Sequence, residues 1–184
     1  MLNIESLTVE SAPERSRAIV AASEKRFGFL PSPVARAAPS PTLLAHLMAS
    51  FAAFDRSSLT SLEREVVAMT VAFENGCHYC MAMHSATLAP EHPEAALRLR
   101  AGSELDDARL EAIRLLARDL VRGRGHLSVE RRSAVTGAGL SNENVLDVVL
   151  GVGAYVLSTF ANLVTDAPLD APFAAWAWRR PHGE

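Results

Sequence analysis

Apolar residues recur along the chain at the spacing of helical faces. The pattern is clearest over 106–122, where one side is apolar and the other charged. A second helix, over 61–75, opens with the capping-box pair Thr60 and Glu63 and is apolar on nearly every side, so neighbouring elements must surround it. No segment alternates strictly between apolar and polar residues, and no Asn-Gly or Asp-Gly turn separates two β-rich runs. The sequence therefore predicts an all-α fold of about seven or eight helices.

The other expected elements follow from the same spacing and from glycine and proline signals. Four prolines between Phe27 and Pro41 predict a largely non-helical crossing. No linker divides the chain, so we expect one domain, 1–184, with an N-terminal arm over 1–15 and a C-terminal tail over 165–184. The remaining helices are expected at 16–27, 42–54, 77–88, 93–100, 128–138 and 145–164.

Composition excludes several classes of function. Hydrophobic residues make up 49% of the chain and charged residues 21%, which argues against disorder, and the net charge of −3 gives no reason to expect nucleic acid or an anionic membrane as a partner. The run 145–164 approaches membrane length, but it contains Asp147, Ser158 and Asn162, which favours a core helix of a soluble protein. The N-terminal residues show no apolar signal region, so we predict a cytoplasmic protein.

The two cysteines of the chain form a single C-x-x-C pair, Cys77 and Cys80, directly after Gly76. The glycine predicts a break between two helices, with both thiols in the first turn of the second helix. Backbone N–H groups at a helix start favour a thiolate over a thiol. Two cysteines are too few for a disulfide scaffold, so the pair indicates a redox centre or a metal site.

Two more residues extend this motif. His84 follows Cys80 by four residues, so the two side chains share a helical face. Glu65 lies on the flank of the apolar face of the preceding helix, where a carboxylate is either paired or solvated. Glu63, explained by capping, and Glu74, near the helix end, are expected in solvent.

The pattern of Glu65, Cys77-His78-Tyr79-Cys80 and His84 resembles the alkylhydroperoxidase D (AhpD)-like family, within the carboxymuconolactone decarboxylase superfamily. The leader Phe27-Gly-Phe-Leu-Pro31, Asn162 and the segment Pro168-Leu-Asp-Ala-Pro-Phe173 are similar to its peroxidase-related branch. The resemblance spans roughly residues 25–175 and implies a single AhpD-like domain.

The resemblance implies a thiol peroxidase that reduces hydrogen peroxide or organic hydroperoxides. A thiolate attacks the peroxide, the sulfenic acid condenses with the second thiol, and Glu65 and His84 relay the proton. We assign the attack on the peroxide to Cys80. Cys77 is the alternative, because the first thiol of such a pair is often the more exposed one. Tyr79, through gating or a hydrogen bond, and His78, through its effect on thiol pKa, are candidates for supporting roles.

No cofactor is expected beyond the redox-active disulfide, which an external thiol or lipoyl-type reductant must reduce. The high apolar share, the tail aromatics Phe173, Trp176 and Trp178, and the resemblance predict a homo-oligomer: a dimer, trimer or hexamer. Three alternatives stay open. They are a carboxymuconolactone-decarboxylase-like lyase, a redox switch, and a zinc site made by the thiols and His84 with Glu65 or Glu74.

Overall fold

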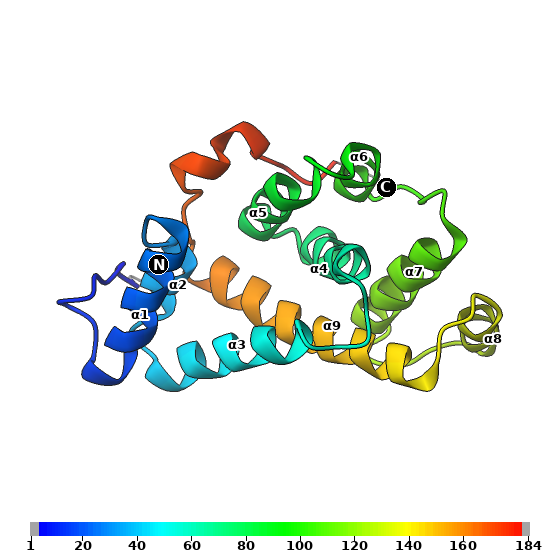
Figure 1. The fold of residues 1–184 in the computed structure, drawn as a ribbon, viewed down its shortest axis with the longest axis horizontal. Helices are drawn as coiled ribbons and strands as arrows, with labels where there is room; N and C mark the ends of the chain where they lie inside the picture. The colour runs from blue at the N-terminus through cyan, green and yellow to red at the C-terminus, as the bar shows by residue number, and fades with distance from the viewer. Residues whose placement is uncertain (1–3, 182–184) are drawn as a thin grey trace.

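The computed structural model describes residues 4–181, and all regular structure in that range is helical (Figure 1). The all-α prediction is confirmed, and the helix expected over 145–164 begins at Asn142, directly after its cap Ser141. The elements are α1 (Glu14–Phe27), α2 (Ser32–Ala37), α3 (Pro41–Phe54), α4 (Ser61–Asn75), α5 (His78–Leu88), α6 (Pro93–Ala101), α7 (Ala108–Arg122), α8 (Val129–Gly137), α9 (Asn142–Val164) and the 3-10 helix η1 (Ala171–Trp176).

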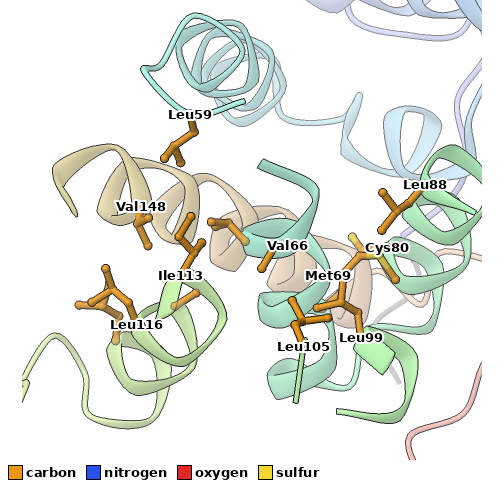
Figure 2. Packing of buried hydrophobic residues seen from close by; sticks show 14 of the residues in the cluster. Leu59, Val66, Met69, Cys80, Leu88, Leu99, Leu105, Ile113, Leu116 and Val148 are labelled. Atoms are coloured by element: carbon orange, nitrogen blue, oxygen red, sulfur yellow. The ribbon is translucent and has the colours of Figure 1, made fainter. Parts of the chain in front are cut away.

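Helix α4 is the centre of the domain and packs against α5, α6, α7 and α9 (Figure 1). Its apolar side chains are shielded from solvent on all sides, with Val66 and Met69 both 0% exposed. Figure 2 shows these two residues between Val148 and Ile113 on one side and the thiol helix, with Cys80, on the other. Each such burial stabilises the fold by roughly 1.5–3 kcal/mol. The thiol helix therefore packs directly against the buried central helix.

The proline-rich crossing contains a helix that the sequence analysis missed. Helix α2 begins at Ser32, and Pro33 occupies its first turn, where a missing backbone N–H removes no helical hydrogen bond. The expected arm packs against this helix: Leu7 donates its backbone N–H to Ala35 at 3.1 Å, and Ala12 is buried. Together these segments and the start of α3 form a second, smaller core.

The C-terminal tail packs on the core of its own chain. The Trp178 ring lies 5.8 Å from the Phe73 ring, and its indole N–H donates to the Arg100 carbonyl at 2.9 Å. The guanidinium of Arg100 in turn donates to the Trp176 carbonyl at 3.0 Å. These contacts hold the tail across α5 and α6 (Figure 1).

Helix α9, which we expected as a core helix, buries only part of its surface. Its polar residues Ser158, Thr159 and Asn162 face inward, whereas much of its apolar surface faces solvent. It is long and apolar enough to cross a membrane, the single such helix in the described part of the chain, and 22% of its most apolar stretch is buried. Its exposed large apolar residues are Leu146, Val149, Leu150, Phe160, Leu163 and Val164.

Candidate active site

The helix–glycine–helix arrangement expected around the cysteines is present. Gly76 ends α4 in the left-handed conformation, with φ of 66°, which a glycine adopts without strain. The backbone N–H of Cys77 donates back to Ala72 at 2.9 Å, and Cys77 then serves as the N-terminal cap of α5. Cys80 follows in the first turn of that helix, so α4 and α5 fix both sulfurs at one junction.

Both thiols are free and buried, with Cys77 1% and Cys80 2% exposed. Helix α9 supplies polar partners. The Asn162 amide donates to Cys80 Sγ at 3.3 Å and more weakly to Cys77 Sγ at 3.8 Å, and Ser158 Oγ lies 3.9 Å from Cys80 Sγ. Asn162 is itself buried, so its amide is a fixed donor to the sulfur pair. Sequence reasoning noted Asn162 only through the resemblance and missed Ser158, although two polar residues four apart on an apolar helix are a usable signal.

The two thiols differ in electrostatic state. A hydrogen bond from the Cys80 thiol lowers the pKa of Cys77 to about 7, helped by the backbone N–H groups of Cys80 and Tyr79 and by Asn162, against the effect of burial. The same hydrogen bond, together with burial and the charge on Cys77, raises the pKa of Cys80 well above its usual value. The pair therefore shares one proton near neutral pH, with the negative charge on Cys77 and the proton on Cys80.

Glu65 and His84 meet as the sequence spacing suggested. Glu65 Oε2 lies 2.8 Å from His84 Nδ1, the histidine is buried, and the Glu65 side chain is 21% exposed. Burial opposes a charge on the imidazole, but the charge and hydrogen bond of Glu65 outweigh it and raise the pKa of His84. His84 Nε2 is buried without a hydrogen-bond partner in residues 4–181, so it is available to a reacting group.

Tyr155 of α9 completes the wall around the histidine, and sequence reasoning did not identify it. Its ring centroid lies 5.1 Å from the centroid of His84, with the two rings nearly perpendicular. Burial, with the charge of Glu65, raises the pKa of the Tyr155 hydroxyl, which therefore stays neutral. Tyr155 orients the imidazole and adds no charge of its own.

The two candidate supporting residues lie in different surroundings. Tyr79 is buried and donates its hydroxyl to Asp170 at 2.6 Å. Asp170 also accepts the backbone N–H of Ser32 at 3.0 Å and the Ser32 hydroxyl, so three segments are joined at one carboxylate. His78, the next residue after Cys77, lines a hollow that opens to solvent.

The two glutamates expected in solvent are not there. Glu63 is 4% exposed and, besides its capping bond, accepts a hydrogen bond from Arg109 Nε at 2.6 Å. The side chain of Glu74 is 6% exposed and pairs with Arg122 at 2.7 Å. Each carboxylate needed an arginine partner from a distant part of the chain, which local spacing does not reveal.

Glu74 thus faces Arg122 instead of the thiols. Within residues 4–181, no cluster of three or more histidine, cysteine, aspartate and glutamate side chains is arranged to hold a metal ion.

Comparison with known proteins supports this reading of the fold and the motif. Residues 41–116, which include Glu65, both thiols and His84, match the carboxymuconolactone decarboxylase family. The resemblance seen in the sequence is confirmed at the level of this match. No match was found among curated proteins.

Solved structures with the same fold cover nearly the whole chain. An alkylhydroperoxidase AhpD core, an uncharacterized peroxidase-related protein from Ralstonia eutropha JMP134, superposes with a TM-score of 0.79 at 18% identity, covering 94% of this chain and 96% of that one. A peroxidase-related protein from Silicibacter sp. TM1040 gives 0.77 at 20% identity, with 93% of each chain covered. The debrominase Bmp8 gives 0.76 at 18% identity, covering 94% of this chain and 95% of that one. These similarities establish an AhpD-like fold.

Proposed function

We propose that the protein is a thiol-dependent peroxidase that reduces hydrogen peroxide or organic hydroperoxides through a Cys77–Cys80 dithiol/disulfide cycle. One observation carries the proposal: two buried thiols share a proton, and one turn further along their helix lies a histidine whose pKa is raised by a carboxylate 2.8 Å away. A thiolate, a resolving thiol and a proton donor are the groups that peroxide reduction requires. All three lie within one helix and its neighbours.

The reaction proceeds in two steps that balance. The thiolate attacks one peroxide oxygen, the O–O bond breaks, and the leaving oxygen takes the proton of the His84 imidazolium to leave as water or an alcohol. The second thiol then attacks the sulfenic acid, forming the Cys77–Cys80 disulfide and releasing water. Glu65, partly exposed beside the buried histidine, returns a proton from solvent to His84.

The difference in pKa between the two thiols changes which sulfur we expect to attack the peroxide. The sequence analysis assigned attack to Cys80 and kept Cys77 as the alternative. The lowered pKa of Cys77 and its position as the cap of α5 favour Cys77 as the nucleophile, with Cys80 as the resolving thiol. We propose this order.

An external thiol must reduce the disulfide, and this requirement separates the proposal from its alternatives. A lyase reaction of the carboxymuconolactone decarboxylase type needs no thiol pair, and a redox switch needs no turnover. Steady-state consumption of hydrogen peroxide or cumene hydroperoxide is the test, with dithiothreitol as the reductant. We expect many turnovers per chain; oxidation of the protein without turnover would favour the switch and contradict the peroxidase.

We also propose that the exposed apolar face of α9 pairs with the same face of a second copy. Its exposed large apolar side chains form two groups, one from Leu146 to Leu150 and one from Phe160 to Val164, and each group contains the three- and four-residue spacings of a helix–helix contact. Glu143 and Asp166 lie at the two ends of this face, which disfavours an anionic lipid surface. Gly153, half-way along the exposed face, leaves room for close approach.

The double variant Leu146→Glu/Leu150→Glu is expected to convert a dimer or larger assembly to a monomer, because it places two charges inside an apolar contact. Multi-angle light scattering at micromolar concentration measures the change. Leu97→Glu is the matched control, since Leu97 is a similarly exposed leucine on α6, remote from this face. A wild-type protein that is already monomeric would contradict the pairing.

A further inference from the structure

A hollow of about 490 Å³ opens at the start of the thiol helix. Gly76 and His78, the two chain neighbours of Cys77, form one side of it. The returning tail forms the other side, where it crosses toward α6 near the C-terminal end of the described chain (Figure 1). A volume of this size accommodates a small organic molecule. Cys77 itself is buried and does not line the hollow, but both of its chain neighbours do.

The hollow is basic although the whole chain is acidic. Its lining contains Arg179, Arg180 and His78 and no acidic side chain. Arg179 is exposed and makes no hydrogen bond or ion pair with another described residue, and no competing carboxylate lies in the lining. Two guanidinium groups near each other select carboxylate or phosphate groups, because their planar N–H forks match the oxygen pair of such anions.

Arg180 is held in place without losing its charge to a partner. Its guanidinium lies over the Phe73 ring at 5.1 Å and donates to the Glu74 carbonyl at 3.2 Å. The Glu74 carboxylate is 3.9 Å away, but Arg122 binds that carboxylate more closely, at 2.7 and 3.0 Å. The positive charge of Arg180 therefore remains available to a ligand.

The rest of the lining is apolar: Leu169, Ala177 and the edge of the buried Trp178. A ligand that suits the whole hollow has a short carbon frame and at least one anionic group. Beside a disulfide that an external thiol must reduce, the fitting molecule is a small thiol that carries a carboxylate.

We propose that this hollow binds the reductant, and that the reductant is a low-molecular-weight thiol bearing a carboxylate. The inference rests on the proposed function. The bound thiolate attacks Cys77 Sγ, the Cys77–Cys80 bond breaks, and Cys80 leaves and is protonated. A second thiol molecule then attacks the mixed disulfide, releasing the oxidised reductant and restoring the Cys77 thiolate.

The test measures reduction of the full chain after its disulfide has been formed with diamide, so that it does not depend on peroxide. Two probes are compared, 3-mercaptopropionate and the neutral 2-mercaptoethanol, with rates expressed per thiolate at low salt. We expect the anionic probe to react about tenfold faster and the preference to fall as salt screens the charges. Arg179→Gln should lower this ratio about fivefold, whereas Arg15→Gln, an exposed arginine on α1, should leave it unchanged.

Equal rates for the two probes in the wild type, or a ratio that Arg179→Gln does not change, would overturn the anionic binding site. A faster reaction with 2-mercaptoethanol would also overturn it and would favour a neutral carrier. A disulfide that forms with diamide but not with peroxide would contradict the peroxidase. The ratio of the rates with the two probes would then still decide whether the hollow binds an anionic thiol. Failure of both oxidants to form the disulfide would overturn both proposals.

Discussion

Replacing either Cys77 or Cys80 with serine is expected to lower peroxide turnover by roughly 1,000-fold or more, the scale typical for removal of an enzyme's nucleophile. The two variants should differ when one equivalent of peroxide is added without reductant. Cys80→Ser keeps a hydroxyl that donates to Cys77, and the backbone N–H groups that stabilise the Cys77 thiolate remain. A sulfenic acid should therefore form on Cys77, where dimedone traps it for mass spectrometry.

In Cys77→Ser, the remaining thiol is buried and lies inside α5, away from the cap position. Its thiolate has less backbone stabilisation, so we expect sulfenic acid to form on Cys80 at least about tenfold more slowly. Melting temperatures of the two variants provide the control for folding. Faster trapping on Cys80 than on Cys77 would restore the assignment made from the sequence and reverse the order proposed here.

Glu65→Gln is expected to lower the rate of peroxide reduction near neutral pH by about 10- to 100-fold, the range of general acid–base assistance. In the wild type, burial disfavours the charged imidazole and Glu65 more than compensates. Without the carboxylate, burial is opposed only by the charge of Cys77, so the pKa of His84 falls and less of the imidazole is charged. The imidazolium then no longer stabilises the neighbouring thiolate, whose pKa rises. Activity should recover in part as pH increases toward that higher pKa.

The control for the pH–rate profile of Glu65→Gln is the profile of a second variant, Glu91→Gln. Glu91 is exposed, follows α5, and makes no hydrogen bond or ion pair that involves its side chain with other described residues. Glu63→Gln is unsuitable as a control because Glu63 is buried against Arg109. Superimposable profiles for Glu65→Gln and Glu91→Gln would show that Glu65 has no part in proton transfer.

Most of what could be predicted from the sequence came from the spacing of residues along single helices. Cys77, Cys80 and His84 lie within two turns of one helix, and Glu65 precedes them on the helix that ends at Gly76, so helical periodicity alone brings three of the four together. The observed 2.8 Å approach of Glu65 to His84 needed only that the two helices pack side by side. The helices themselves followed from apolar spacing and capping residues.

Long-range contacts account for what the sequence analysis missed. Ser158 reaches Cys80 across 78 residues, and Asp170 reaches Tyr79 across 91. Glu63 looked solvated because its partner, Arg109, is 46 residues away. In each case the partner is set by how helices pack, which no local pattern encodes. The helix at Pro33 was missed for another reason, since proline breaks a helix interior but fits its first turn.

The central claim is a reversible disulfide formed by peroxide, and the stoichiometry of a single turnover tests it most directly. Fully reduced protein is mixed with one equivalent of hydrogen peroxide and no reductant, and remaining peroxide, free thiols and intact mass are measured together. The account predicts that each chain consumes one peroxide, loses both thiols and loses two hydrogens, with a Cys77–Cys80 crosslink in the peptide map and full recovery of the thiols after dithiothreitol. Two free thiols that survive excess peroxide would contradict it.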